Sequence, residues 1–362
     1  MPSQPFDHRP APNGAGRPPI GAAHRPDGDL PPVGGAAPAG SAATPDAVLI
    51  SEVGPRDGLQ SVRQVMATAA KCAWLDSLVA AGLKEIEVGS FVPAARLPQL
   101  ADTAEVVRHA LGHAGVTVMA LVPNRVGAQA ALAAGVHKLT MPVSASLAHS
   151  LANVRRTPAQ MLQEVKAVLQ LRSELAPQCR VEVGLSTAFG CTLQGAVDED
   201  DVLALAEQLA QAGVDEVGLS DTTGMAHPTQ VHRLFTRLRA RLGPRAGAAH
   251  LHNTRGLGLA NCLAAYQAGV RTFDASLAGL GGCPHAPGAS GNVVTEDLVF
   301  MFEAMGVPTG VDLSRLLAAR EPLRAGLPGE PLYGALAEAG LPPGFEPATA
   351  GTARPWGPAD AR

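Results

Sequence analysis

The chain has 362 residues, of which 46% are hydrophobic but only 3% aromatic, so its core must be filled with Ala, Val and Leu. The formal net charge is −4 and no Lys- or Arg-rich run forms a basic stripe, which argues against nucleic acid and anionic membranes as partners. No apolar stretch approaches membrane-spanning length.

Residues 1–46 are predicted to form a disordered leader. They are rich in Pro, Gly and Ala and carry no periodic apolar pattern that could bury enough surface to offset the entropy of ordering. Asp7, Asp27, Asp29 and the repeated prolines argue against an amphipathic mitochondrial presequence. We therefore expect a cytoplasmic protein.

From Ala47 onward, short β-branched runs alternate with longer Ala- and Leu-rich segments of helical period, which indicates repeated βα units. Eight strands are predicted, at Val48–Val53, Glu85–Gly89, Thr117–Val122, Lys138–Val143, Arg180–Leu185, Glu216–Ser220, Ala248–His252 and Thr272–Ser276. Four intervening helices end in Ala-Gly, where glycine can supply the left-handed cap, at Gly82, Gly135, Gly213 and Gly269. Eight such units predict an α/β fold, a (β/α)₈ TIM barrel over residues 47–310, rather than an open doubly wound sheet.

The chain beyond the barrel is predicted to form a short C-terminal helical extension over residues 311–345. Helical segments are expected at Leu313–Arg320 and around Leu332–Ala339. Residues 346–362 are rich in Pro and Gly, which predicts a disordered tail.

Two strand ends carry residues suited to a metal site, because polar groups at the C-terminal ends of barrel strands face the active site. The first strand runs into Arg56 and Asp57, and the seventh ends in His250-Leu251-His252. Side chains alternate along a strand, so both imidazoles are expected on one face. Together with Asp57 they predict a bound cation, with a salt-linked surface turn as the alternative for Arg56 and Asp57.

A glycine-dense loop, Gly279–Asn292, follows the eighth strand and carries one thiol, Cys283, and one amide, Asn292. The loop is longer and richer in glycine than an ordinary connection between a strand and a helix. We expect a lid that closes over the substrate, excludes water and delivers Cys283 as a proton donor. The alternative is a loop with an incidental cysteine.

Other strand ends give weaker signals. Glu87 and Ser90 follow the second strand and Asp221 follows the sixth, but Asp221 suits a helix cap equally well. The remaining cysteines lack the spacing of a zinc site and are expected to be small buried residues, with Cys191 placed to line the mouth: Cys72, Cys179, Cys191 and Cys262. An odd number of cysteines, five, favours a reducing compartment.

With these motifs in place, the chain resembles the 3-hydroxy-3-methylglutaryl-CoA lyase family, within the metal-dependent lyase and synthase barrels, over roughly Val48 to Gly310. The most specific match is the run from Ala278 to Pro284, continued by Ala289–Asn292 and Thr295–Asp297. Supporting stretches are Glu52–Gln60, Ser90–Val92, Ser220–Gly224 and His250–His252.

The resemblance implies a divalent cation, Mg²⁺ or Mn²⁺, held by Asp57, His250, His252 and Asn292. It further implies metal-dependent cleavage of 3-hydroxy-3-methylglutaryl-CoA to acetyl-CoA and acetoacetate.

Roles for single residues follow from the same resemblance. Arg56 would stabilise the developing enolate, Cys283 would be the mobile catalytic thiol, and Glu87 and Asp221 would complete the pocket. His250 or Asp57 would handle the substrate proton.

The CoA contacts and the assembly are less constrained by the sequence. By position, Arg63 is a candidate partner for a CoA phosphate, and a solvated arginine is the alternative. A homodimer is expected by analogy with related barrels.

Two departures from the family pattern bear on the substrate. Asn253 and Arg255 stand where the family tends to carry Asp and Tyr, and Thr192-Leu193-Gln194 replaces a Pro-Tyr-Glu-like stretch. Both are expected beside the substrate mouth, which keeps citramalyl-CoA and longer-branched glutaryl-CoA open as substrates. A Claisen-type synthase related to isopropylmalate synthase and a non-catalytic acyl-CoA-binding barrel are the remaining alternatives.

Overall fold

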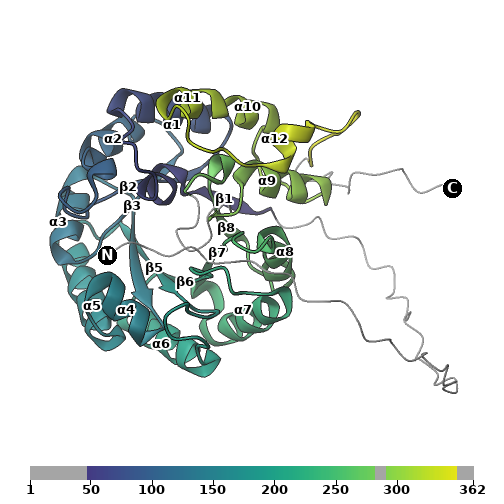
Figure 1. Ribbon diagram of the computed structural model, residues 1–362. Coiled ribbons are helices and arrows are strands. Elements are labelled where there is room, and N and C mark those ends of the chain that lie inside the picture. Colours follow the sequence, from purple (N-terminus) through teal and green to yellow (C-terminus); the bar gives the residue numbers. More distant parts are fainter. Residues whose placement is uncertain (1–46, 282–290, 349–362) are drawn as a thin grey trace, which may run out of the picture. The chain divides into compact units, whose positions relative to one another are not determined.

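The computed structural model describes residues 47–281 and 291–348 (Figure 1). The expected leader, most of the glycine-dense loop with Cys283, and the end of the expected tail lie outside the described residues. No helix in the described part of the chain combines the length and apolarity needed to cross a membrane.

Eight parallel strands close into a barrel in the order β1 to β8, with helices around it, so the predicted TIM barrel is confirmed. The strands are β1 (Leu49–Glu52), β2 (Glu85–Ser90), β3 (Thr117–Leu121), β4 (Lys138–Ser144), β5 (Arg180–Ser186), β6 (Glu216–Ser220), β7 (Ala246–His250) and β8 (Thr272–Ala275). The helices of the outer ring are α1 (Thr68–Ala80), α2 (Thr103–Ala110), α3 (Arg125–Ala134), α4 (Leu147–Val154), α5 (Pro158–Leu175), α6 (Glu199–Ala212), α7 (Pro228–Leu242), α8 (Gly258–Gln267) and α9 (Thr295–Ala304).

The predicted strands agree with the observed ones except in β7, which begins and ends two residues before the predicted range. His252 therefore lies beyond the strand, where it forms an antiparallel bridge with Asn292. The strand ends early because the residues after His250 pair with the chain that returns after β8 instead of with the neighbouring strands. The backbone amide of Asn253 donates to the Gly291 carbonyl at 2.8 Å.

The C-terminal segment contains α10 (Leu313–Ala318), α11 (Arg320–Gly326) and α12 (Ala335–Ala339). The helix predicted over Leu313–Arg320 thus ends early, and a second helix continues after Ala319. Helix α12 starts later than the helix predicted around Leu332–Ala339. The Asp297 carboxylate accepts from the backbone amides of Ala335 and Leu336 at 2.9 and 2.8 Å, which fixes the first turn of α12 at these residues.

The start of the barrel strands holds a buried charge cluster. The Lys138 ammonium contacts Glu182 at 2.6 Å, Glu216 at 3.1 Å and Glu85 at 3.3 Å. Burial opposes the charge on Lys138, but the three carboxylates outweigh it and raise the pKa of the ammonium. Burial also raises the pKa of Glu182 to about 7.

All four predicted cap glycines have positive φ, and Gly82 and Gly213 offer a matched test of what such a position requires. At Gly82 (φ +101°) a Cβ would lie 2.5 Å from the Gly310 carbonyl oxygen, whereas at Gly213 (φ +103°) nothing lies within 4 Å.

We expect Gly213→Ala to cost about 1 kcal/mol of unfolding free energy, from backbone strain alone. Gly82→Ala adds a clash with backbone and should cost about 2–4 kcal/mol. Chemical denaturation of both variants checks this, and equal losses would refute the clash.

Candidate active site

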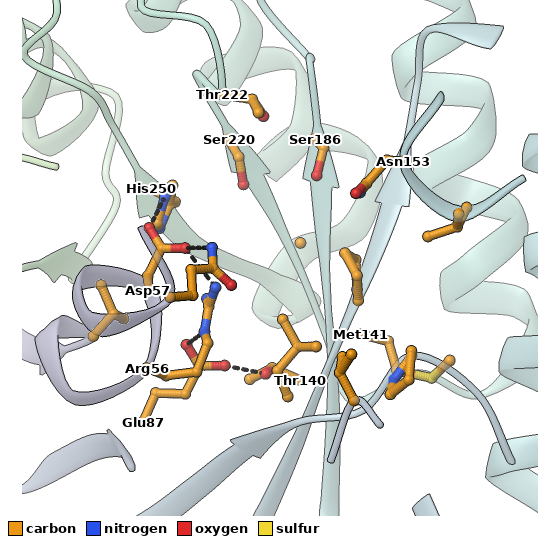
Figure 2. A pocket seen from close by; sticks show the side chains of 18 of the residues that line it. Arg56, Asp57, Glu87, Thr140, Met141, Asn153, Ser186, Ser220, Thr222 and His250 are labelled. Atoms are coloured by element: carbon orange, nitrogen blue, oxygen red, sulfur yellow. Dashed lines mark hydrogen bonds and ion pairs between the residues drawn. The ribbon is translucent and has the colours of Figure 1, made fainter. Parts of the chain in front are cut away.

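The turn after β1 carries Arg56 and Asp57 into the mouth of the barrel. Residues Gly54–Gly58 form a single π-helical turn, with the amides of Asp57 and Gly58 donating to the Val53 carbonyl at 2.7 and 3.3 Å. A π turn inserts one extra residue relative to an α turn, which re-aims the side chains that follow a strand. Both charged groups consequently point into the cavity (Figure 2).

Arg56 is fixed by two carboxylates. Its Nε donates to Glu87 Oε2 and its terminal nitrogen to Asp57 Oδ1, both at 2.5 Å. Glu87 is held in turn by the Thr140 hydroxyl, which donates to Oε1. Burial acts against the charge, yet Glu87 and Asp57 raise the pKa of the guanidinium, so Arg56 stays cationic although it is mostly buried.

Asp57 is a shared acceptor. Its Oδ1 also accepts from Gln60 at 2.6 Å, and its Oδ2 accepts from the Asn292 amide at 2.7 Å. Burial would raise the pKa of this carboxyl, but the charges of Arg56 and then of the imidazoles hold it well below its usual range. Asp57 is therefore ionised throughout the physiological range.

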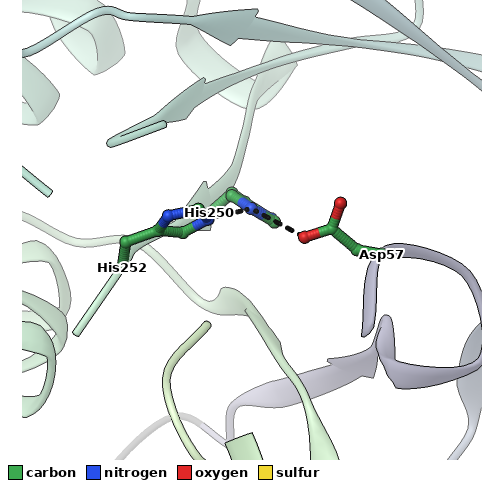
Figure 3. A group of neighbouring side chains, drawn as sticks. All are labelled: Asp57, His250 and His252. Carbon is green, nitrogen blue, oxygen red and sulfur yellow. Dashed lines mark hydrogen bonds and ion pairs between the residues drawn. The ribbon is translucent and has the colours of Figure 1, made fainter. Parts of the chain in front are cut away.

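His250 and His252 face one another with their Nε2 atoms 3.2 Å apart, and His250 Nε2 lies 3.8 Å from Asp57 Oδ2 (Figure 3). On its other side, His250 Nδ1 bonds Asp274 Oδ2 at 3.0 Å. Burial opposes protonation of His250, but Asp274 outweighs it and raises the pKa. Burial and the neighbouring His250 lower the pKa of His252 to about 4, so this ring is neutral at pH 7.

This arrangement fits a divalent cation. Asp57, His250 and His252 each offer one ligand atom, all within 4.8 Å of one another. The 3.2 Å between the imidazole nitrogens is close to the roughly 3 Å that separates adjacent ligands around an octahedral ion with bonds of about 2.1 Å. Asn292, whose amide nitrogen already bonds Asp57, has its amide oxygen as a fourth ligand group.

Asp274 is the main group that the sequence analysis missed. A carboxylate that accepts from the far nitrogen of a ligating imidazole orients the ring and raises its basicity. The available signal was a single acid within an otherwise apolar strand, Thr272–Ala275. Thr140 and Gln60 were also missed, because an uncharged side chain within a strand or turn gives no pattern.

Two predicted site residues lie apart from this cluster. Asp221 does not line the cavity: its Oδ1 accepts from the amides of Met225 and Ala226 at 2.8 and 3.1 Å, and burial raises its pKa to about 6. Arg63 is exposed and does not line the cavity either. Cys283 falls outside the described residues, but Gly281, two residues earlier, lines the cavity.

Gly281 places the start of the glycine-dense loop against the turn that carries Arg56 and Asp57. Its φ is +90°, and a Cβ there would lie 2.7 Å from the Gly58 Cα. Only glycine permits this direct contact between the two backbones. Cys283 comes two positions later in the sequence.

Buried acids hold the segment before this loop. Glu52 accepts from the amides of Gly54 and Leu277, each at 2.9 Å, and from the Thr295 hydroxyl at 2.7 Å. It thereby joins β1, the end of β8 and α9. Burial raises its pKa to about 7.

Glu296 supports the same segment from α9. It accepts from the Ala278 amide at 3.0 Å and pairs with Arg320 of α11. Arg320 in turn donates to the Tyr333 carbonyl at 2.7 Å. The C-terminal segment is thereby connected, through Arg320 and Glu296, to the residues that follow β8.

The cavity has a volume of about 820 Å³ and extends from the Asp57 cluster to the C-terminal end of α4. Ser186, Ser220 and Thr222 line one wall, and Asn153 lies across the pocket from Asp57 (Figure 2). Arg155 and Arg156, which follow Asn153 in the sequence, also line the cavity. A volume of this size accommodates a small acyl group with part of a longer carrier.

The residues that depart from the family pattern are absent from the cavity lining formed by the described residues. Asn253 accepts from the Gly258 amide at 3.0 Å, and Arg255 donates to the carbonyls of Thr223 and Gly224. Gln194 accepts from the Ser146 hydroxyl at 2.9 Å. Each of these three side chains therefore stabilises loop structure. Cys191 is likewise buried and absent from the lining.

Comparison with known proteins places the chain. The HMGL-like family model matches residues 47–322. The (R)-citramalyl-CoA lyase of Chloroflexus aurantiacus is 42% identical over 306 residues, covering 82% of this chain and 95% of that protein. The hydroxymethylglutaryl-CoA lyase of Pseudomonas mevalonii is 42% identical over 267 residues, covering 74% and 88%.

Solved structures agree. The HMG-CoA lyase of Bacillus subtilis is 39% identical, with a TM-score of 0.78 over 82% of this chain and 98% of that one. An HMG-CoA lyase from Acinetobacter baumannii, in complex with coenzyme A and 3-methylmalate, is 40% identical, with a TM-score of 0.77 over 83% and 98%. Fold and site thus define a barrel lyase. The chain belongs to the HMGL-like family, and the expected lyase class is confirmed.

Asp274→Asn should weaken divalent-cation binding by about 10–100-fold, because an amide cannot replace the carboxylate that orients His250. Isothermal titration with Mn²⁺ measures this. Ser186→Ala, which removes a hydroxyl from the cavity wall, is the matched control and should leave cation affinity unchanged. Equal affinities for Asp274→Asn and the unmodified protein would remove Asp274 from the site.

Glu52 predicts a pH-dependent stability. In the unfolded chain this carboxyl ionises near 4.5, but in the folded chain near 7, so between these values the folded state binds more protons. The contribution of Glu52 to the free energy of unfolding is complete below pH 4.5. It is lost as the pH rises to 7, by an amount on the order of 1–3 kcal/mol. Glu52→Gln mimics the protonated form and should flatten this part of the profile. Urea unfolding at pH 5 and pH 7.5 tests it, and an unchanged slope contradicts the assignment.

Proposed function

We propose that the chain cleaves the C2–C3 bond of a 3-hydroxy-3-methyl acyl-CoA, with 3-hydroxy-3-methylglutaryl-CoA as the first candidate and acetyl-CoA and acetoacetate as products. The observation that carries the proposal is the cluster of Arg56, Asp57, His250 and His252 at the mouth of the barrel. The named activities of the relatives support the same reaction.

Mg²⁺ or Mn²⁺ is the proposed cation, with Asp57, His250, His252 and Asn292 as its ligands. When bound, a divalent cation supplies Lewis acidity to the 3-hydroxyl and a neighbouring substrate oxygen. The support is the convergence of three ligand groups on one point and the neutral state of His252.

The proton of the 3-hydroxyl must move to a base near this point. His250 and Asp57 are the two candidates. Asp57 keeps free lone pairs while it ligates the cation, but its low pKa makes it a weak base. Asp274 stabilises the positive charge that His250 acquires, and His250 would accept the proton on Nε2 while that atom is not a ligand. Loss of that proton lets the C–O electrons form the ketone as the C2–C3 bond breaks.

The departing thioester enolate carries negative charge, and Arg56 is the candidate to stabilise it. Glu87 and Asp57 hold the guanidinium in one orientation, so little reorganisation is required as charge develops. Glu87 acts through Arg56 as a positioning residue. Cys283 is the proposed acid that delivers a proton to C2 of the enolate. Asp221 is proposed to act indirectly, through the loop it caps.

A second candidate substrate is citramalyl-CoA. The citramalyl-CoA lyase match covers 95% of that protein. Its acid arm is one methylene shorter than that of 3-hydroxy-3-methylglutaryl-CoA, a difference worth only about 1–3 kcal/mol in a pocket. A longer-branched glutaryl-CoA, a Claisen-type synthase reaction and binding without turnover are further alternatives that the same assay separates.

CoA binding, assembly and location are also proposed. The CoA moiety is proposed to occupy the part of the cavity near Arg155 and Arg156. Arg63, which is exposed and lies outside the cavity lining, is a proposed phosphate contact beyond it. A homodimer is proposed and can be tested by sedimentation. A cytoplasmic location is supported by the free thiols of the four described cysteines.

Acetyl-CoA release from a panel of 3-hydroxy acyl-CoA thioesters, with Mg²⁺ or Mn²⁺ and with EDTA, tests the function. We expect metal-dependent release, highest with 3-hydroxy-3-methylglutaryl-CoA. Cys283→Ala should lower the rate severely, by about 10²–10⁴-fold, with cation affinity retained. Absence of metal-dependent turnover with every thioester would overturn the lyase proposal, and full activity of Cys283→Ala would remove the thiol from it.

A further inference from the structure

A second group of metal-type side chains lies on the outer ring of helices, away from the barrel mouth. Asp76 belongs to α1, His109 to the last turn of α2, and His113 follows α2 by three residues. Asp76, His109 and His113 each offer one ligand atom, and these atoms lie within 4.8 Å of one another. None of the three lines the active-site cavity.

The two imidazoles converge on a single carboxylate oxygen. His109 Nε2 lies 2.6 Å and His113 Nε2 lies 2.8 Å from Asp76 Oδ1. The rings stand nearly edge to face, with centroids 5.6 Å apart and an angle of 71° between their planes. The Nε2 atoms of both rings are thus directed at the same carboxylate oxygen of Asp76.

Local backbone structure produces this convergence. The spacing of four residues places His109 and His113 one turn apart on the same face, because the amides of Gly112 and His113 continue the helical turn by donating to His109 and Ala110. Asp76 reaches the pair from α1, which packs beside α2. Two imidazoles at this spacing, with a carboxylate from a neighbouring element, form the donor set that zinc prefers.

An ion pair alone explains the cluster less well. The side chains are 36%, 28% and 49% exposed for His109, His113 and Asp76, and exposed ion pairs contribute little to stability. One carboxylate oxygen can accept from both rings, but a cation held between the three groups would use all three as ligands.

We propose that Asp76, His109 and His113 form a surface site for a borderline transition metal, Zn²⁺ first, with solvent in the fourth position. Ligand atoms of a tetrahedral zinc ion with bonds of about 2.0–2.1 Å lie roughly 3.3 Å apart. The present separations of 2.6 and 2.8 Å require only a small opening of exposed side chains.

Such a site joins α1 to α2. The ion would bind the folded chain and not the unfolded one, so its binding free energy adds to stability. The site is distinct from the proposed catalytic centre in position and in ligands, because it lacks the amide and the guanidinium partner.

The test measures zinc per chain after equilibrium dialysis against buffered ZnCl₂, followed by elemental analysis. We expect His109→Ala/His113→Ala to bind one equivalent less zinc than the unmodified protein and to lose the zinc-dependent rise in melting temperature. His232→Ala removes an exposed histidine of α7 and is the matched control, expected to change neither quantity.

A second background separates the two sites. The variant Asp57→Ala/His252→Ala, which lacks two proposed catalytic ligands, should still bind the one equivalent of zinc assigned to the surface site. The fourfold variant that also carries Asp76→Asn and His109→Ala should lose that equivalent. With Co²⁺ as the probe, the same comparison should abolish one set of visible absorption bands. Thiolester cleavage with Mg²⁺ should be unchanged in His109→Ala/His113→Ala, so the outcome is independent of the proposed lyase activity. Unaltered zinc content in that variant would overturn the surface site.

Discussion

The arrangement of the active site depends on one carboxylate. Asp57 accepts from Arg56 and Gln60 on one oxygen and from Asn292 on the other, and it lies against His250. Since these groups come from different parts of the chain, a single side chain fixes the relative positions of the β1 turn, the end of β7 and the chain returning after β8. Its ionised state follows from the same contacts, because the cationic and donor groups around it outweigh burial.

The sequence predicted the fold well because βα repetition leaves a strong periodic signal. The barrel order and most strand bounds follow from apolar runs and glycine caps. The limits of β7 did not, because they depend on pairing with residues near Gly291, more than thirty positions away. Helix breaks near Ala319 and the late start of α12 similarly depend on tertiary hydrogen bonds that no local pattern records.

The candidate site was predictable to the extent that its groups stand at strand ends. Arg56, Asp57, His250 and His252 meet at the barrel mouth as the strand positions indicated. Asp274 and Thr140 were not predicted, since their roles arise from side chains on neighbouring strands of the closed barrel. Asn253 and Arg255 show the converse: adjacency to a histidine in sequence did not place them at the cavity, because the chain turns sharply after β7. The composition of the glycine-dense loop already indicated Cys283 and Asn292, but the role of Asn292 as a cation ligand came only from the resemblance to the lyase family. Of these two residues, the described part of the chain includes Asn292.

The charged groups that line the cavity are balanced in number but separated in position. The four carboxylates are those of Asp57, Glu87, Glu182 and Asp274, and the four guanidinium groups are those of Arg56, Arg96, Arg155 and Arg156. Asp57, Glu87 and Asp274 gather around Arg56 and His250, whereas Arg155 and Arg156 follow Asn153, which lies across the pocket from Asp57 (Figure 2). A cation is attracted to the first group and an acidic ligand to the second, because the sign of the nearest charges dominates the local potential. The two kinds of charge are thus drawn to different ends of one chamber.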